Sequence, residues 1–236
     1  ADPDLAEAHA AMGFVLAAQQ YRWKDGEEEF RKALNLNPDS GLTHGLYALA
    51  VLAPHGRPET LAEFRRALEL DPNSSFINFV YAFALLASGD AAAAVKQYER
   101  TLELENIHPD MLWDYGMALG YAGRHGDARQ AFLRHLKVTG QAGNELSGLQ
   151  AYFAGDPGRC RGDLPKAEKL VMAGREDRMD LVRQAALCGD PETAFRWLER
   201  AIEARESQAI WLRVDPRLEP LRGDPRFTPL AARLGL

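Results

Sequence analysis

The sequence has 236 residues, of which 46% are hydrophobic and 26% charged, a composition typical of a chain that buries a sizeable core. Its 28 basic and 34 acidic residues give a net charge of -6, which disfavours non-specific binding to nucleic acid because that binding needs a basic surface. No stretch of about eighteen uncharged apolar residues occurs, so we expect no membrane span.

The first feature along the chain is an internal repeat. Residues 32–40, Lys-Ala-Leu-Asn-Leu-Asn-Pro-Asp-Ser, recur at residues 66–74 as Arg-Ala-Leu-Glu-Leu-Asp-Pro-Asn-Ser, a step of 34 residues. Weaker copies follow at the same step, at residues 100–104 and 134–138. Four copies on one period indicate a repeat architecture.

Each repeat unit has the hydrophobic pattern of a helix hairpin. Phe30, Ala33 and Leu34 fall on one helical face, and equivalent residues recur in each later unit. An apolar stretch precedes each of these helices, and the two are separated by turn-forming residues such as Asp25-Gly26 and Ser88-Gly89-Asp90. Because a single hairpin cannot bury both of its faces, the units are expected to stack.

These residues resemble the tetratricopeptide repeat (TPR) family, which places small residues where the two helices of a hairpin touch and aromatic residues where hairpins stack. The chain departs from the family pattern in three ways. The first turn has one extra residue, Thr60 stands where the second unit usually has a small residue, and the tryptophan usual early in the first helix is absent. The matching positions are Gly13, Gly26, Phe30, Ala33, Pro38; Ala48, Phe64, Ala67, Pro72; Tyr81, Ala82, Gly89, Ala94, Tyr98; and Tyr115, Gly116, Tyr121, Gly123, Ala128, Phe132.

The second half of the chain has a weaker pattern. Asp190 and Pro191 read as the N-cap and first residue of a helix, whose apolar face would carry Phe195, Leu198, Ala201 and Ile202. Residues 143–154 and 164–174 are expected to form one irregular hairpin, joined by a loop at residues 155–163.

The tail at residues 214–227 resembles the C-terminal ending of many bacterial TPR regions, which leads into a short final helix, here residues 228–234. We therefore predict a right-handed all-α solenoid with four TPR units over residues 1–140, degenerate hairpins over 141–205 and a cap over 206–236. Ala1-Asp2-Pro3-Asp4 resembles the end of a preceding unit, which predicts a fragment of a longer protein that retains its natural C-terminus.

Motifs that carry chemistry are absent from the sequence. It has no phosphate-binding loop, no His-Glu-x-x-His or Cys-x-x-Cys metal spacing, and no Gly-x-Ser-x-Gly nucleophile motif. Two cysteines are too few for a disulfide framework; Cys160 lies between two arginines that could lower a thiol pKa, but both cysteines are expected to be inert. His9 and His44 occupy equivalent positions in two repeats. We therefore predict no enzymatic activity, no cofactor and no metal site.

What remains is the surface lined by the first helix of each unit, which is the concave face in the arrays that this chain resembles. It carries no set of Lys, Asn and Arg of the kind that holds chaperone C-termini, so that ligand class is disfavoured. Its apolar character predicts a groove for a protein or peptide segment. The predicted partner-binding residues are Phe14, Leu49, Phe76, Phe79, Phe83, Trp113, Met117 and Tyr121.

Two other interpretations of this surface remain. Neighbouring helices could bury these side chains against each other, or the groove could be filled by the tail or by a second copy of the chain. A self-association scaffold, a homodimer through this face or an array end, is therefore the alternative function. The resemblance implies the regulatory or sensory C-terminal part of a larger bacterial signalling protein. From its charge and hydropathy, we expect this segment itself to bind neither nucleic acid nor membrane. A cytoplasmic location is expected, with the periplasm as the alternative.

Overall fold

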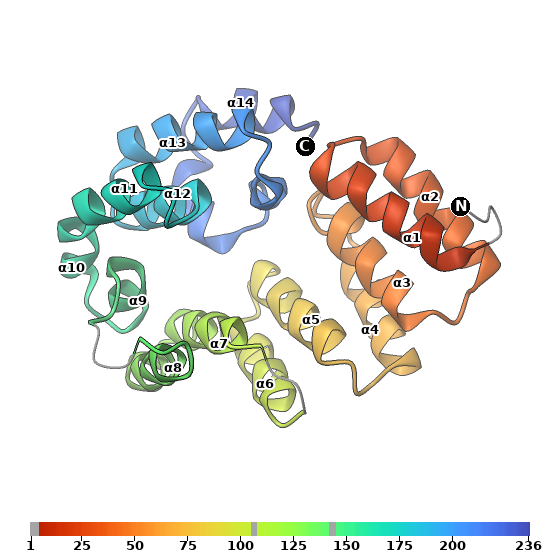
Figure 1. Ribbon diagram of the computed structural model, residues 1–236. Coiled ribbons are helices and arrows are strands. Elements are labelled where there is room, and N and C mark those ends of the chain that lie inside the picture. Colours follow the sequence, from red (N-terminus) through yellow and green to blue (C-terminus); the bar gives the residue numbers. More distant parts are fainter. Residues whose placement is uncertain (1–4, 105–107, 142–144) are drawn as a thin grey trace.

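The computed structural model describes residues 5–104, 108–141 and 145–236, and every regular element in those ranges is helical. Figure 1 shows antiparallel helices stacked side by side along a curved path, which confirms the predicted all-α solenoid. The prediction drawn from residues 1–4 lies outside the described ranges. Within these ranges, no helix has both the length and the apolar character that a membrane crossing requires.

The first four hairpins follow the repeat of the sequence. In the first two hairpins, a short π-helical segment extends the first helix. The paired elements are α1 (Ala6–Phe14) and η1 (Val15–Gln19) with α2 (Trp23–Leu36), α3 (Gly41–Tyr47) and η2 (Ala48–Leu52) with α4 (Thr60–Leu70), α5 (Ser75–Ala87) with α6 (Ala91–Leu102), and α7 (Asp110–Tyr121) with α8 (His125–Val138).

The second half continues the stack with shorter elements. These are α9 (Gly148–Phe153), α10 (Pro157–Gly162), α11 (Leu164–Met172), α12 (Arg178–Leu187), α13 (Pro191–Glu203), the 3-10 helices η3 (Ser207–Trp211) and η4 (Pro216–Leu221), and α14 (Phe227–Arg233). The predicted helix start at Asp190 is confirmed, since its carboxylate accepts a hydrogen bond from the Thr193 backbone N at 3.1 Å. The final helix begins one residue before the predicted position.

Small residues set the distance between the two helices of a hairpin. A Cβ placed on Gly13 would lie 2.9 Å from the Phe30 ring and 3.0 Å from the Gly26 carbonyl oxygen. A Cβ on Gly116 would lie 2.6 Å from the ring of Phe132. Real Cβ contacts are longer than this, so each helix pair depends on the glycine for its close approach.

Aromatic side chains join neighbouring hairpins in a regular row. Each pair links the second helix of one unit to the first helix of the next, with ring centroids between 5.6 and 6.5 Å apart. At these separations aromatic rings attract one another beyond the area that they bury. The pairs are Phe30 with Tyr47, Phe64 with Tyr81, and Tyr98 with Tyr115.

The prediction of a loop over residues 155–163 is wrong, because this segment contains α10. The side chain of Asp156 accepts a hydrogen bond from the Arg159 backbone N at 3.2 Å, and Pro157 occupies the first helical turn, so the segment carries its own helix start. As a result α9 pairs with α10, and α11 packs instead against α12.

The prediction that the two cysteines are inert single thiols is also wrong. Cys160 lies in α10 and Cys188 directly follows α12, and the stacking of these helices brings their Cα atoms to 5.6 Å, where the two sulfurs form a disulfide. Their 28-residue separation in sequence hid this proximity.

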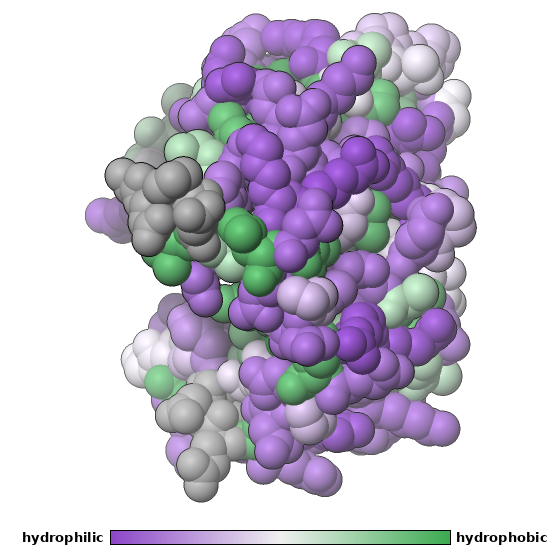
Figure 2. Space-filling model, turned by 90° about the vertical axis from the view of Figure 1, so that its right-hand side faces the viewer, coloured by the Kyte–Doolittle hydropathy of each residue, from purple (hydrophilic) through white to green (hydrophobic). Residues whose placement is uncertain are grey.

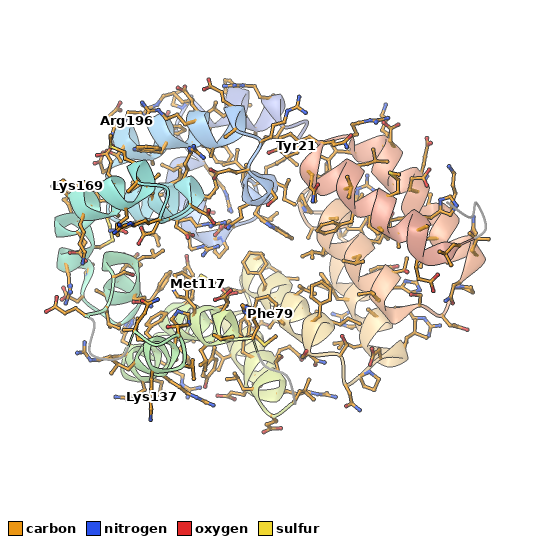
Figure 3. All side chains as sticks on the ribbon, viewed as in Figure 1. Tyr21, Phe79, Met117, Lys137, Lys169 and Arg196 are labelled. Atoms are coloured by element: carbon orange, nitrogen blue, oxygen red, sulfur yellow. A yellow bond between two sulfur atoms is a disulfide. The ribbon has the colours of Figure 1, made fainter. Side chains whose placement is uncertain are left out.

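The C-terminal segment returns to the first hairpin and closes the solenoid into a ring (Figure 1). The Tyr21 hydroxyl, labelled at this junction in Figure 3, donates to the Glu206 carbonyl oxygen at 2.9 Å. The Trp23 indole Nε1 donates to the Leu234 carbonyl oxygen at 2.6 Å. Ile210 is buried in the core cluster of the first hairpin. The concave face therefore looks into an enclosed interior.

Candidate functional site

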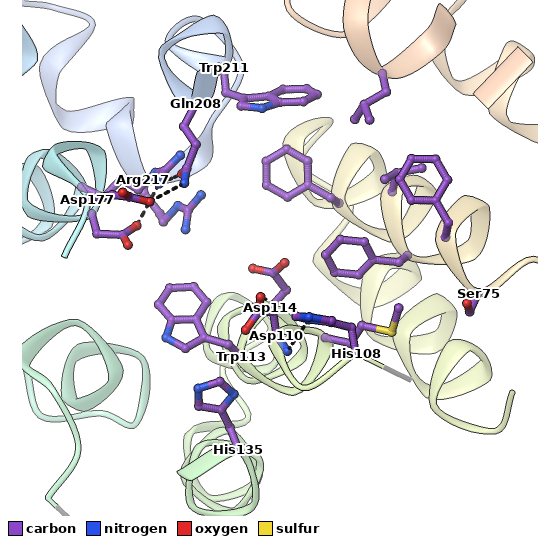
Figure 4. Close-up of a pocket in the computed structure, with 18 residues that line it drawn as sticks. Ser75, His108, Asp110, Trp113, Asp114, His135, Asp177, Gln208, Trp211 and Arg217 are labelled. Carbon is purple, nitrogen blue, oxygen red and sulfur yellow. Dashed lines mark hydrogen bonds and ion pairs between the residues drawn. The ribbon is translucent and has the colours of Figure 1, made fainter. Parts of the chain in front are cut away.

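A cavity of about 840 Å³ lies inside the ring (Figure 4). Helices α5 and α7 form one wall of this cavity, and α12, η3 and η4 contribute residues from the opposite side. The first wall is mainly aromatic and the second mainly charged. Large apolar side chains lining the cavity are Leu49, Phe76, Phe79, Phe83, Trp113 and Trp211.

Five of the eight residues predicted for the concave face line this cavity, and three do not. Phe14 is half-buried against the core of the first hairpin. Met117 is fully buried in the hydrophobic core on the side of α7 that faces away from the cavity surface. Tyr121 is half-buried with its ring 5.1 Å from that of Phe153. The five that line the cavity are Leu49, Phe76, Phe79, Phe83 and Trp113.

Trp211 is an aromatic residue of the cavity that sequence reasoning missed. It lies at the end of η3, and its ring meets the ring of Phe83 edge-on with centroids 5.2 Å apart. The C-terminal segment thus fills part of the concave surface, one of the occupants left open above. The sequence hinted at this position only through the size and aromatic character of Trp211, which stands in the segment predicted to be a cap.

The charged wall is built around Asp215, which is fully buried. Its carboxylate accepts hydrogen bonds at 2.8 Å from Arg183 Nε and from Nε and one terminal nitrogen of Arg217. Both arginines are also buried. Burial alone would raise the pKa of Asp215, but the two guanidinium groups hold that pKa well below its usual range. The carboxylate is therefore ionised and its charge is matched by the arginines.

The same cluster extends to the surface of the cavity. Arg183 also donates to Asp180 Oδ1 at 2.9 Å and to the side-chain oxygen of Gln208, and the Gln208 amide donates to Asp177 Oδ2 at 3.0 Å. These residues belong to the degenerate half and the tail, where sequence reasoning found no repeat register. They meet because the tail packs against α12.

Asp114 projects from α7 into the cavity across from this charged wall, as labelled in Figure 4. No hydrogen bond or ion pair joins it to another residue that the structure describes. Its burial raises its carboxyl pKa to about 7, although Arg217 and Arg183 lower it, while Asp215 and Asp110 raise it further.

The histidines of the first two repeats have a structural role. His9 Nδ1 lies 2.5 Å from Glu29, and His44 Nδ1 lies 2.5 Å from Glu63, so each joins the two helices of its own hairpin in the same way. In the described ranges, no three His, Cys, Asp or Glu side chains gather closely enough to hold a metal ion. The cavity instead combines aromatic surface, one carboxylate without a hydrogen bond or ion pair to a described residue, and two arginines that share the carboxylate of Asp215.

Helix hairpins, small residues inside each hairpin and aromatic pairs between hairpins define a TPR-like helical repeat protein. Solved structures of two such proteins resemble it over nearly their full lengths. PilW, titled a widely conserved type IV pilus biogenesis factor, shares 16% identity with a TM-score of 0.61, covering 92% of this chain and 97% of its own. Pseudomonas aeruginosa PilF shares 16% identity with a TM-score of 0.57, covering 96% of each chain.

A third similar structure belongs to a larger assembly, that of Naa15/Naa10 bound to HypK-THB. The identity is 18% and the TM-score 0.52, over 95% of this chain and 35% of the other. No protein-family model and no curated protein sequence matches this chain. At identities below 20%, the likeness concerns the helical-repeat fold alone.

Proposed function

We propose that this chain is a non-catalytic protein- or peptide-binding module whose binding surface is the interior cavity. The observation that carries the proposal is the aromatic wall, because five residues singled out from the sequence meet Trp211 around one cavity. Its volume of about 840 Å³ falls in the range of roughly 300–1,000 Å³ in which ligand sites occur. Buried aromatic side chains are also the commonest anchors of protein interfaces.

A display experiment tests this role. A random dodecapeptide phage library is panned on the immobilised chain, and selected clones are then tested on two variants. Phe83→Asp places a charge on the aromatic wall, whereas Leu133→Asp changes an exposed leucine on α8 outside the cavity. We expect the clones to bind the wild type and Leu133→Asp but not a Phe83→Asp variant whose circular dichroism is unchanged. Equal binding to both variants would remove the cavity from the proposal.

We further propose that the module is the regulatory or sensory part of a larger bacterial protein. The support is the resemblance of its repeats and tail at residues 214–227 to C-terminal arrays of that kind. Immunoblotting of source cells with antiserum against the chain should detect a polypeptide well above the mass of these 236 residues. A band at the mass of the chain itself would make the module free-standing.

Self-association is the alternative function, and it has less support. The C-terminal segment already occupies part of the concave face through Trp211. The face of the molecule in Figure 2 is largely hydrophilic, with small separate hydrophobic areas, and isolated exposed residues such as Met12 and Leu42 are normal on protein surfaces. Static light scattering over a concentration series should give a monomer, and a dimer throughout would restore the scaffold function.

The disulfide leads us to propose a compartment other than the cytoplasm that the sequence suggested. A disulfide persists in oxidising compartments and is rare where thiols are kept reduced, so the Cys160–Cys188 bond favours the periplasm or the cell exterior. When source cells are lysed in denaturant that contains a thiol-reactive polymer, the protein should shift on a gel only if it is first reduced. A shift without reduction would show free thiols and return the protein to the cytoplasm.

A further inference from the structure

We propose that the interior cavity binds the side chain of an arginine or lysine of a peptide partner, with the cationic group at Asp114 and the stem on the aromatic wall. This inference rests on the proposed function and adds the chemistry of the partner. Arrays that hold the carboxylates of chaperone C-termini use the opposite charge, so it is not an extension of that mode.

The charges around the cavity favour a cation. Four carboxylates line it, those of Asp110, Asp114, Asp177 and Asp180, against two guanidinium groups, those of Arg183 and Arg217. Both guanidinium groups donate hydrogen bonds at 2.8 Å to the buried carboxylate of Asp215 in the same wall. With Asp215, five carboxylates stand against these two guanidinium groups, so the cavity keeps an excess of negative charge that would repel an anionic ligand.

Asp114 marks the position of the cation. Asp114 is half-buried, and a carboxylate that is partly withdrawn from water gains from a hydrogen bond or a cation beside it. Asp114 lines the cavity, yet no hydrogen bond or ion pair joins it to a described residue. A guanidinium or ammonium group entering the cavity would supply what the protein omits at this carboxylate.

The aromatic residues fit the rest of such a side chain. Trp113 precedes Asp114 on α7, while Phe79, Phe83 and Trp211 also line the cavity (Figure 4). Aromatic faces attract cations, and they also pack against the methylene stem of lysine or arginine. The Trp113 ring already accepts Arg217, whose guanidinium carbon lies 5.7 Å from its centroid. An arginine of the partner would use the same chemistry on the remaining rings.

The test uses defined peptides on the full chain. The host is acetyl-Gly-Ala-Leu-Arg-Leu-Ala-Gly-amide, and its central arginine is replaced by lysine, citrulline or glutamate. Binding is followed by tryptophan fluorescence, because Trp113 and Trp211 both line the cavity. Citrulline keeps the shape of arginine without its charge. We expect the arginine peptide to bind about tenfold or more tightly than the citrulline peptide, the factor that one charged hydrogen bond supplies.

Asp114→Asn is the matched variant, since it keeps the shape of the side chain and removes its charge. It should abolish the preference for arginine over citrulline while the neutral peptide binds as before. Because the surroundings raise the pKa of Asp114 to about 7, its ionised form is disfavoured in the folded state, so the variant should fold and melt at a higher temperature than the wild type at pH 8. A preference that survives in Asp114→Asn would overturn the assignment of this carboxylate.

The pH dependence gives a second readout. The groups that act on Asp114 are Asp110 on its own helix, Tyr98 on α6, Arg183 on α12, and Asp215 and Arg217 at η4. Since the Asp114 pKa is about 7, its ionised fraction rises about tenfold from pH 6 to pH 8, and affinity for the arginine peptide should rise with it. His108 and His135 also line the cavity, so the Asp114→Asn profile serves as the reference that contains only their contribution.

The outcomes separate this inference from the proposed function. Equal or tighter binding of the citrulline or glutamate peptide would overturn the cation site and leave a peptide-binding cavity. Failure of every host peptide would also overturn it. In that case clones from the display library, selected without any assumption about charge, decide the proposed function on their own.

Discussion

Asp215→Asn is the substitution whose effect on stability the structure fixes best. The fully buried Asp215 carboxylate compensates two buried guanidinium groups, those of Arg183 and Arg217. Removing one partner from a buried ion pair destabilises a protein by about 3–5 kcal/mol, because a charge remains in a place that water cannot reach. For a chain of this length, a loss of that size lowers the melting temperature by roughly 6–20 °C.

The chain contains a matched control for this substitution. Asp224-Pro225-Arg226 repeats the local geometry of Asp215-Pro216-Arg217, since each carboxylate accepts hydrogen bonds from the backbone N, Nε and one terminal nitrogen of the arginine two residues later. The side chain of Asp224 is 25% exposed and that of Asp215 is 0% exposed. Asp224→Asn should therefore change the melting temperature far less than Asp215→Asn.

The pH dependence of the same pair carries a definite sign. The arginines hold the pKa of Asp215 below its unfolded value, so its contribution to stability is present above about pH 4 and is lost as the pH falls further. Thermal unfolding of the wild type and Asp215→Asn should differ most at neutral pH, and the difference should narrow in acid. Equal losses for the two asparagine variants at neutral pH would refute the reasoning, because burial would then have no role.

Three further predictions concern other parts of the fold. Reducing the Cys160–Cys188 bond, which spans 28 residues, should lower the free energy of unfolding by roughly 3–4 kcal/mol, and an unchanged melting temperature in reductant would contradict this. Gly116→Ala would place a Cβ 2.6 Å from the ring of Phe132, so it should lower the free energy of unfolding in urea titrations by about 1–3 kcal/mol. Gly126→Ala is its control: this glycine lies in α8 with no atom within 4 Å of an added Cβ, so the substitution should be neutral or stabilising. Trp23→Phe removes the hydrogen bond to the C-terminal segment and should speed amide exchange in α14; unchanged exchange there would show that this bond does not hold the closure.

The sequence predicted the part of the fold that depends on contacts within a repeat unit and between adjacent units. The 34-residue period, the glycines inside the hairpins and the aromatic rows between them are contacts between adjacent units, so they leave a local pattern. The short helix α10 was missed because Gly155, Pro157 and Gly158 were read as loop residues, although a proline in a first turn starts a helix.

The ring closure was not predictable in the same way. Tyr21 and Glu206 are 185 residues apart, and Trp23 and Leu234 are 211 apart, so no periodicity links them. The sequence yielded the aromatic wall of the cavity, which follows the repeat register, and missed the charged wall. Arg183, Asp215 and Arg217 meet because η4 of the tail packs against α12, in a part of the chain where the sequence shows no repeat register.

The closure also gives the tail two roles. As a cap, residues 206–236 cover the last hairpin and contact the first one through Ile210. As part of a binding site, the same segment supplies Trp211 and Arg217 to the cavity. Because neighbouring positions of one segment perform both tasks, a change that loosens the closure also moves one wall of the cavity relative to the other. We therefore expect a ligand that contacts both walls to stabilise the closed solenoid, by an amount that grows with the logarithm of its concentration over its dissociation constant.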